Sequence, residues 1–471
     1  MLQMTFQQAE NMSRSLTLQL AEFATAMWAA DVPTAVISAA NNALVDTIGC
    51  ALGGVAEPVS QITRRTVAEL GSPPVLGVWG TGMRASLLDA AFLNGVASHA
   101  LDFDDNLPSQ RGHPSTTVFP AVLAAAAHTS ASGRDILAAY AIGLEVSGKL
   151  GRAVGPGHYV RGYHATATIG IFGATTAAAR ILGLNEHQLA QAWGLAASQM
   201  SGLLANFGTM AKPFHAGHAA RCALASALLV RAGMTASDHI FDGDRSMIST
   251  YRGDDATGLA PQLQRLEQPW DILDPGVFVK RWACCLCSHR PLAGVLDLVQ
   301  KHGIRNEEIT AIEIGFPPGT DAGLVDGLPT NGLAGKFSIE YAAAVAVIDG
   351  DLTLQSFSDA AFGRDEVHQL MLRVRRYRMP EEPAGSASIG HNYVAITTPR
   401  GRFETRVDTL PGSPSNPLSR DELDAKFIGC AEPTLGAEQA AHALKLARAL
   451  HQQPDCAALL QALTSERDPI S

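Results

Sequence analysis

Glu308-Ile-Thr-Ala-Ile-Glu-Ile314 alternates apolar and polar residues along its whole length. This two-residue period is typical of a strand with one buried face. The same alternation returns at Tyr393–Thr397 and, after the turn Pro399-Arg400-Gly401, at Arg402–Val407. Because only a short turn separates these last two segments, the pattern predicts a β-hairpin.

Two segments between these strands, Phe337–Ile348 and Arg364–Val374, have a helical pattern instead. Strands and helices therefore share this part of the chain, whose character changes near Pro269. We expect a smaller α+β domain over residues 269–408.

The chain before this domain is repeatedly helical. Apolar residues recur at three- and four-residue spacing, and Gly and turn residues separate the segments. Ala-rich runs such as Ala121–Ala127 favour closely packed helices, because Ala has the highest intrinsic helix propensity. The expected helices are Leu16–Trp28, Pro33–Leu52, Ser86–Ala100, Ser115–His128, Gly133–Val154, Thr166–Leu182 and Glu186–Gly208.

The chain after residue 408 returns to helix. Pro411-Gly-Ser-Pro414 interrupts the pattern, and Ser419 followed by Glu422 has the spacing of a capping box at a helix start. The predicted fold is mainly α: a large all-helical domain at 1–268, the smaller α+β domain at 269–408, and a C-terminal helical segment at 409–471 that packs back on the large domain.

Composition restricts the classes of partner. The 471 residues include 35 Lys and Arg against 45 Asp and Glu, a formal charge of −10. This acidic balance argues against nucleic acid, which requires a basic surface. It does not exclude an anionic substrate, because a few cations inside one pocket decide that locally.

The location is expected to be cytoplasmic. Met1–Leu20 contains no apolar core of a signal peptide, and we find no apolar run of the roughly 18–20 residues that cross a membrane. The seven cysteines, three of them at Cys284, Cys285 and Cys287, are typical of reduced thiols rather than of a disulfide framework.

The densest polar cluster is Asp102-Phe-Asp-Asp-Asn106, which leads to Arg111-Gly-His-Pro-Ser115. Three carboxylates so close together repel one another unless cations, hydrogen bonds or protonation compensate. A solvated acidic loop that caps the next helix would also explain the pattern. The adjacent Arg111 and His113 favour a functional site instead.

Two further clusters contain histidines. His158-Tyr159 and Tyr163-His164 precede an Ala- and Gly-rich helix, and Lys212-Pro-Phe-His215 precedes another. Because Lys212 stands before a proline, we expect it to be extended and outside the following helix. A lysine at a helix entrance beside histidines suits anion binding or proton transfer, although a surface lysine is the ordinary alternative.

Neither a metal nor a dinucleotide cofactor is expected. The segment Cys284-Cys-Leu-Cys-Ser-His289 lacks the paired cysteine spacing of a zinc knuckle, so buried thiols are the preferred interpretation. Gly80-Thr-Gly82 has glycines at dinucleotide-binding spacing, but no alternating series of strands and helices surrounds it.

Several of these motifs, in collinear order from about residue 15 to 430, resemble the MmgE/PrpD family, which includes 2-methylcitrate dehydratase, cis-aconitate decarboxylase and iminodisuccinate epimerase. The resemblance implies a large helical domain, a smaller α+β domain, an active site between them and a homodimer. The motifs are His99-Ala-Leu-Asp-Phe-Asp-Asp105, Gly112-His-Pro-Ser115, Gly162-Tyr-His164, Lys212-Pro-Phe-His-Ala-Gly217, Lys280 with the following Cys and His, Lys336-Phe-Ser-Ile-Glu-Tyr341 and Pro411-Gly-Ser-Pro414.

The resemblance also implies site residues. The positions that match catalytic positions of the decarboxylase branch are Asp102, His113, His164, Lys212 and Lys280. The positions expected to contact substrate are Asn106, Arg111, Tyr163, Cys285 and Tyr341. Asn106 stands where many relatives have Thr, and Cys285 stands where the decarboxylase branch has His.

The expected activity is that of a cofactor-independent lyase, a hydro-lyase similar to 2-methylcitrate dehydratase, acting on a small di- or tricarboxylic acid. Lys212, Lys280 and Arg111 would hold the carboxylates, while His113 and His164 would exchange the proton α to one of them. An epimerase similar to iminodisuccinate epimerase is one alternative. A metal-dependent hydrolase that uses Asp102, Asp104 and Asp105 is another.

Overall fold

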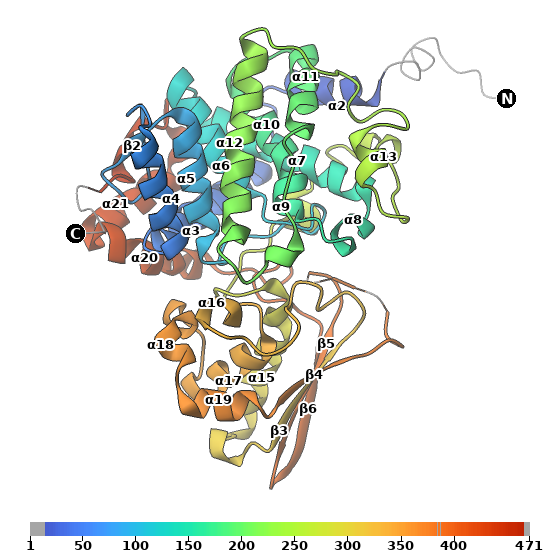
Figure 1. Ribbon diagram of the computed structural model, residues 1–471, viewed down its shortest axis with the longest axis vertical. Helices are drawn as coiled ribbons and strands as arrows, with labels where there is room; N and C mark the ends of the chain where they lie inside the picture. Colours follow the sequence, from blue (N-terminus) through green and yellow to red (C-terminus); the bar gives the residue numbers. More distant parts are fainter. Residues whose placement is uncertain (1–14, 384, 387, 466–471) are drawn as a thin grey trace, which may run out of the picture.

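The computed structural model describes residues 15–383, 385–386 and 388–465. Figure 1 shows a large helical part above and a smaller part below that contains a sheet flanked by helices. This arrangement confirms a mainly α fold with an added α+β portion, whereas the boundaries at residues 268 and 408 stay predictions. The sequence predicts no signal peptide over Met1–Leu20, and residues 1–14 of that segment lie outside the described residues.

The helical part begins with α2 and includes one short hairpin, formed by β1 (Leu76–Gly77) and β2 (Arg84–Ala85). The predicted helix over 166–182 is divided into α9 and α10, and the helix predicted to reach Gly208 ends at Ala197. The helices are α2 (Leu16–Ala26), α3 (Thr34–Gly54), α4 (Pro58–Leu70), α5 (Leu87–Ala100), α6 (Ser115–Thr129), α7 (Gly133–Val154), α8 (Gly157–Val160), α9 (Ala165–Thr168), α10 (Gly170–Ile181), α11 (Glu186–Ala197), α12 (Ala211–Arg231), α13 (Met247–Tyr251) and α14 (Ala260–Leu263).

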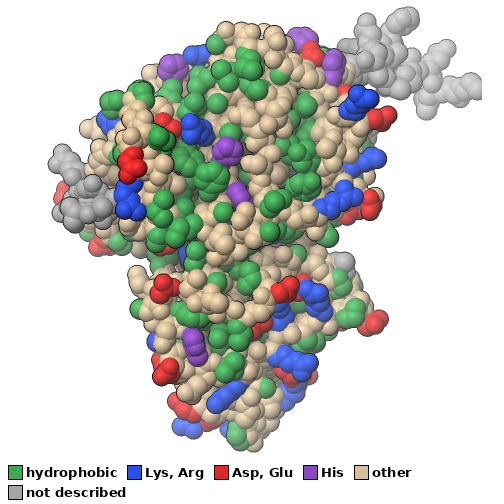
Figure 2. Space-filling model, viewed as in Figure 1, with side chains coloured by type: hydrophobic (Ala, Val, Ile, Leu, Met, Phe, Trp, Pro, Cys, Tyr) green, Lys and Arg blue, Asp and Glu red, His purple; other side chains and the backbone are tan. Residues whose placement is uncertain are grey.

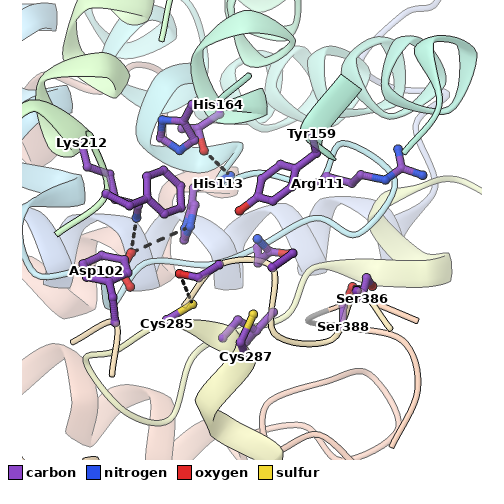
Figure 3. A pocket seen from close by; sticks show the side chains of 18 of the residues that line it. Asp102, Arg111, His113, Tyr159, His164, Lys212, Cys285, Cys287, Ser386 and Ser388 are labelled. Atoms are coloured by element: carbon purple, nitrogen blue, oxygen red, sulfur yellow. Dashed lines mark hydrogen bonds and ion pairs between the residues drawn. The ribbon is translucent and has the colours of Figure 1, made fainter. Parts of the chain in front are cut away.

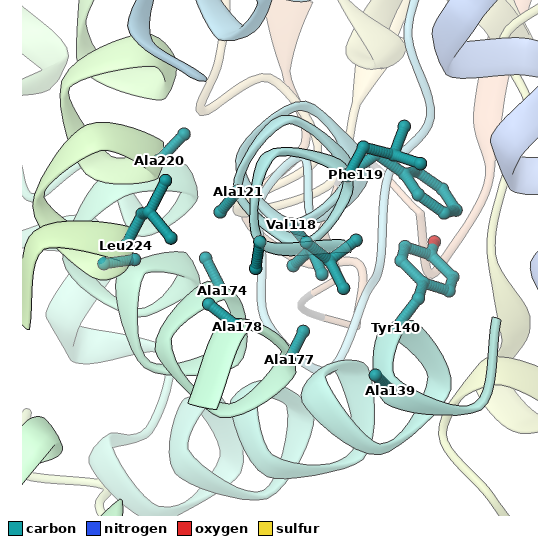
Figure 4. Close-up of a cluster of buried hydrophobic side chains, with 14 of the residues drawn as sticks. Val118, Phe119, Ala121, Ala139, Tyr140, Ala174, Ala177, Ala178, Ala220 and Leu224 are labelled. Atoms are coloured by element: carbon teal, nitrogen blue, oxygen red, sulfur yellow. The ribbon is translucent and has the colours of Figure 1, made fainter. Parts of the chain in front are cut away.

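Small side chains bring these helices close together (Figure 4). Helix α10 packs against α6, α7 and α12 through a surface that includes Ala174, Ala177 and Ala178. Helices α5 and α12 approach at Gly95 and Gly217, where a Cβ added to Gly95 would lie 2.7 Å from the Cα of Gly217. Because α5 leads into the acidic loop and α12 begins with Lys212, this close approach brings two predicted site segments together.

The sheet has the strand order β4-β3-β5-β6. Strands β3 (Ala311–Phe316) and β4 (Val374–Arg378) are parallel, while β5 (Asn392–Thr398) is antiparallel to both β3 and β6 (Gly401–Val407). The predicted hairpin is therefore confirmed. The pattern did not predict β4, because its sequence Val-Arg-Arg-Tyr-Arg has charged residues in place of apolar ones, as suits the edge of a sheet.

Helices accompany the sheet. Helix α15 contacts β5 and β6, and α17 contacts α15, α19 and β4. The predicted helix at 337–348 is observed as α17, and the helix predicted over 364–374 ends at Met371, before β4. The helices of this part are α15 (His289–His302), α16 (Gly332–Gly335), α17 (Ile339–Asp349), α18 (Asp359–Phe362) and α19 (Asp365–Met371).

The C-terminal helices lie against the helical part. Helix α20 (Arg420–Leu435) packs on α3, and α21 (Ala437–Arg448) contacts α20, α3 and α22 (Ala457–Ala462). The predicted capping box is present, since Ser419 Oγ accepts from Glu422 N and the Glu422 carboxylate accepts from Ser419 N.

Among the described residues, α3 is long and apolar enough to cross a membrane by length and composition. This differs from the sequence analysis, which found no apolar run of that length. However, 78% of its most apolar stretch is buried among the protein's own helices. Helix α3 contacts α5, α7 and α20, so we interpret it as a core helix.

Candidate active site

A cavity with about 820 Å³ of space between protein atoms lies where the two parts meet (Figure 3). The helical part contributes side chains such as Tyr159, His164 and Lys212 to its wall. The smaller part contributes Cys285 and Phe337, among others. A concave site where two parts of a molecule meet is typical of small-molecule binding.

The acidic loop between α5 and α6 forms one wall, and its backbone is held in an unusual conformation. Asp102 and Arg111 have φ angles of 53° and 59°, the left-handed region that non-glycine residues seldom adopt. Paired hydrogen bonds between Asn106 and Phe278 tie the loop to the chain that leads to Lys280. Such backbone strain is concentrated at functional sites, where the surrounding structure stabilises it.

Asp102 lies between two buried ammonium groups. Lys212 donates to its Oδ1, while the Nζ of Lys280 lies 3.0 Å from Oδ2 and donates to the Asp102 carbonyl oxygen at 2.8 Å. Burial raises the pKa of Asp102, but Lys212 and Lys280 lower it more, so its pKa falls below the ordinary value. Burial lowers the pKa of Lys280, and Asp102 outweighs that effect and raises it. The carboxylate and Lys280 are thus charged at neutral pH.

Asp104 holds two histidines in place. The Nδ1 atoms of His99 and His113 each lie 2.9 Å from one of its carboxylate oxygens. Burial raises the pKa of Asp104, but the two histidines lower it by more than burial raises it. Asp104 is therefore ionised and only accepts hydrogen bonds. The proton of each imidazole is therefore at Nδ1. This leaves the Nε2 of His113 free of a proton, 3.9 Å from Asp102.

Asp105, the third carboxylate of the metal-dependent hydrolase alternative, does not line the cavity. Its Oδ2 accepts from Ser115, whose Oγ also lies 2.6 Å from the Tyr140 hydroxyl. Burial and the nearby Asp46 raise the pKa of Asp105 well above its ordinary value. The loop reduces the repulsion of its three carboxylates by pairing two with lysines or histidines, while burial raises the pKa of the third.

His164 immediately precedes α9, and the residue is buried, with 1% of its surface exposed. Its Nδ1 lies 3.0 Å from the Nδ1 of His215, and its Nε2 is buried with no hydrogen-bond partner among the described residues. Burial, followed by Lys212 and His99, lowers the pKa of His164 well below 6.5. The ring is neutral at neutral pH and forms part of the cavity wall.

Lys212 lies inside α12, not before it as predicted from the following proline. Proline is compatible with the first helical turn, because the backbone N–H groups there have no partner within the helix. The ammonium also contacts His99 Nε2 at 3.1 Å and lies 5.0 and 5.3 Å from the ring centres of Phe207 and Phe337. It is thus fixed by contacts from both parts of the molecule.

The structure places eight of the ten predicted site residues on the cavity wall: Asp102, Asn106, Arg111, His113, His164, Lys212, Lys280 and Cys285. Tyr163 and Tyr341 do not line it. Tyr163 stacks on His158, and Tyr341 is fully buried with its hydroxyl donating to the Ser356 carbonyl. Neither side chain lines the cavity, and their expected contact with substrate stays a prediction.

Sequence reasoning missed other members of the site. His99 and Asp104 belong to the motif His99-Ala-Leu-Asp-Phe-Asp-Asp105 but were not chosen as site residues. Helix α5 ends between them, and the turn that follows brings Asp104 into contact with both His99 and His113. Tyr159, whose hydroxyl points into the cavity, lies one turn before Tyr163 and was the better candidate (Figure 3). Ser386 and Ser388 lie in a loop before β5 for which no sequence signal pointed to the site.

The three clustered cysteines are buried free thiols. Cys285 and Cys287 line the cavity, whereas Cys284 packs into the core of the smaller part. The Cys285 thiol donates to the Gly323 carbonyl at 3.4 Å. A neighbouring thiol, Cys287, is the main cause that lowers the pKa of Cys285.

One group of described residues has the spacing of metal ligands. Ligand atoms of His99, Asp102, Asp104 and His113 all lie within 4.8 Å of one another. The Lys212 ammonium already contacts Asp102 and His99, and Lys280 contacts Asp102. Because these ammoniums supply the positive charge that a metal ion would bring, we interpret the cluster as an ion-pair network.

Comparison with known proteins gives matches along most of the chain. Residues 18–259 match the sequence profile of the MmgE/PrpD N-terminal domain, and residues 282–452 match that of the MmgE/PrpD C-terminal domain. Cis-aconitate decarboxylase from Homo sapiens is 27% identical over 448 residues, covering 92% of this chain and 91% of the human protein. The enzyme of that name from Mus musculus is 28% identical, covering 82% and 80%, and the one from Aspergillus terreus is 24% identical, covering 90% and 91%.

Proposed function

The chain belongs to the MmgE/PrpD family of enzymes, and from this premise we propose that it is a lyase that removes a proton α to a carboxylate of a small di- or tricarboxylic acid. The relatives named as decarboxylases support a lyase-type function. The observation that carries the proposal is the pair of buried ammoniums on Asp102, together with two histidines on the same cavity wall. The Nε2 of His113 lies 3.9 Å from Asp102, and the Nε2 of His164 has no hydrogen-bond partner among the described residues.

The ammonium groups have capacity left for a substrate. Each lysine has three N–H donors. Lys212 uses two on Asp102 and His99, and Lys280 uses one on the carbonyl oxygen of Asp102 while forming an ion pair with its carboxylate. At least one donor of each remains for a substrate carboxylate. Arg111, Lys212 and Lys280 line the cavity, whereas Asp102 is the one carboxylate on its wall among the described residues, so the wall favours an anionic ligand.

The histidines supply the proton transfer. With Asp104 holding the proton of His113 at Nδ1, the Nε2 of that ring is a base, and the Nε2 of His164 faces the same cavity. When a base takes the α-proton, negative charge spreads onto the adjacent carboxylate. The remaining N–H donors of the lysines stabilise that charge more strongly than the charge of the substrate itself, which lowers the barrier.

Proton NMR in D₂O tests the proposal with 2-methylcitrate, citrate, cis-aconitate and iminodisuccinate. A hydro-lyase removes the α-hydrogen signal of a hydroxy acid and forms an alkene and water. A decarboxylase instead converts cis-aconitate to an acid with one carboxylate fewer and releases CO₂. Exchange of the α-hydrogen without net product would indicate an epimerase instead. No change with any of the four acids would contradict the proposal.

A chelator-treated sample belongs in the same experiment. The proposal expects equal rates before and after chelation, since lysines and histidines do the chemistry. Loss of activity that returns with added metal would favour the metal-dependent hydrolase. The homodimer and the cytoplasmic location stay predictions, and light scattering of the purified chain tests the first.

A further inference from the structure

His215 lies behind His164 and does not line the cavity. It is in the second turn of α12, about one turn after Lys212, and it is 7% exposed. Gly202, with a φ of 131°, packs against both rings: a Cβ there would lie 3.3 Å from the Cγ of His215 and 3.4 Å from the Cβ of His164. The two rings are therefore held in contact by backbone on one side and by α12 on the other.

The contact between the rings fixes how protons are arranged. Burial and then Lys212 lower the pKa of both histidines, that of His215 to about 4, so each neutral ring carries one proton. A hydrogen bond between the two Nδ1 atoms, 3.0 Å apart, needs one proton between them. The rings therefore have opposite tautomers: when His164 donates from Nδ1, its Nε2 has a lone pair, and when it accepts, its Nε2 carries a proton.

We propose that His215 is a positioning residue whose Nδ1 accepts a hydrogen bond from the Nδ1–H of His164. This hydrogen bond keeps the cavity-facing Nε2 of His164 unprotonated, so that it can act as a base. This inference rests on the proposed function. In the proton-transfer step the α C–H bond of the substrate breaks, its electron pair stays on carbon, and the proton forms a new N–H bond at His164 Nε2. The resulting imidazolium donates from Nδ1 to His215, which stabilises the added charge.

The surroundings leave His215 as the group that can set the tautomer of His164. The charged and titratable groups that act on His164 are Lys212 and His215 from α12, His99 from α5 and His113 from the acidic loop. None of these supplies a carboxylate to His164, whereas His99 and His113 each have Asp104. Within the described residues, His215 is thus the one group in hydrogen-bond contact with the ring of His164.

Substitution of His215 tests the role. His215→Phe keeps an aromatic ring but cannot accept a hydrogen bond from His164. We expect kcat to fall about 10²–10⁴-fold, the range of general-base catalysis, and KM to change less than threefold. His215→Asn puts an amide oxygen near the position of Nδ1 and should restore the rate to within about tenfold of the original. The control is His218→Phe, one turn further along α12, where the half-exposed ring stacks on Phe214; it should leave kcat unchanged.

A second measurement does not depend on turnover. In protein labelled with ¹⁵N-histidine, nitrogen chemical shifts report the tautomer of each ring. We expect His164 protonated at Nδ1 in the unsubstituted protein and redistributed toward Nε2 in His215→Phe. A His164 ring protonated at Nε2 in the unsubstituted protein would overturn the inference, and so would a His215→Phe variant with full kcat. If none of the four acids reacts, the proposed function fails while the nitrogen shifts still decide the role of His215.

Discussion

At the scale of single residues, charge is compensated pair by pair. Asp102 has two ammoniums, Asp104 has two imidazoles, and Asp105 accepts a hydrogen bond from Ser115 and has a raised pKa. An isolated buried charge would cost several kcal/mol, whereas a paired one with further hydrogen bonds costs far less. The site therefore carries many ionisable groups because each is balanced by a named neighbour.

Lys212 is the residue whose removal should affect turnover most. Lys212→Met keeps much of the side-chain volume and removes the ammonium that binds Asp102, His99 and, in our proposal, substrate. Losing one preorganised donor costs about 10²–10³-fold in kcat. Steady-state kinetics on the reactive acid checks this, with Lys301→Met, an exposed lysine on α15, as the matched control. A Lys212→Met variant within threefold of the original rate would contradict the carboxylate-binding role.

At the scale of elements, the sequence predicted those segments whose pattern is set by burial. Strands β3 and β5 have apolar residues on a buried face, and β6 alternates between half-buried and exposed residues. Most of the core helices were located by their periodicity. Strand β4 was missed because an edge strand with three arginines lacks that alternation. The start of α12 was misplaced because a proline in the first turn and a proline that ends a helix have the same sequence signal.

The candidate site was predictable to a different degree. The ten predicted residues came from motifs, and eight reached the cavity, because motif residues on neighbouring loops were brought together as expected. The contacts of Tyr341 and Asp105 were not predictable, since no local pattern states which way a side chain points. His215 and Tyr159 were missed for the same reason, as each lies within one helical turn of a residue that was chosen.

Helix α20 is tied to the site by one side chain, Lys426. Its Nζ lies 2.6 Å from Asp46 on α3 and donates to the carbonyls of Phe103, at 2.7 Å, and Lys280, at 2.9 Å. Phe103 follows Asp102 in the acidic loop. A single ammonium on the C-terminal segment thus binds the backbone on both sides of the Asp102–Lys280 ion pair.

Lys426→Met should therefore destabilise the protein by about 3–5 kcal/mol, because it leaves Asp46 buried without its cation. The double variant Lys426→Met with Asp46→Asn should recover part of that loss. Urea unfolding measures both, and Lys445→Met, an exposed lysine on α21, is the control. If Lys426→Met unfolds at the same urea concentration as the control, the buried pair contributes nothing measurable.

At the scale of the whole molecule, both parts are needed to complete one site. The helical part supplies Lys212 and the histidines, and the chain that leads into the smaller part supplies Lys280 and Cys285. Figure 2 shows charged side chains scattered over the visible surface of both parts, while the groups that carry the proposed chemistry are buried between them. Chemistry at the junction thus depends on the folding of the entire chain.

That burial gives the whole molecule a defined dependence of stability on pH. Burial lowers the pKa of seven histidines, to about 3 for His99 and His289 and about 4 for His215. In the unfolded chain these groups have a pKa near 6.5. Between the two values the unfolded state binds more protons, so the free energy of unfolding falls as the pH drops below about 6.5. The seven are His99, His113, His158, His164, His215, His218 and His289.

Buried acids oppose this trend. The raised pKa of Asp46, Asp105 and Glu145 means that the folded state binds protons there before the unfolded state does, which stabilises the fold as pH falls. The histidines outnumber them, and each can contribute up to about 1.4 kcal/mol per pH unit. We therefore expect the urea midpoint to decrease from pH 7 to pH 5.

His289→Leu isolates one of these contributions. His289 lies in the smaller part, 5.3 Å from the Trp282 ring centre and away from the cavity wall, so its replacement should not disturb the proposed chemistry. Because the variant loses one group that must stay neutral to fold, its urea midpoint should decrease less between pH 7 and pH 5. His187→Leu, an exposed histidine, should keep the full slope. A midpoint that stays level or rises toward pH 5, or equal slopes for the two variants, would show that buried neutral histidines do not set the acid stability of this protein.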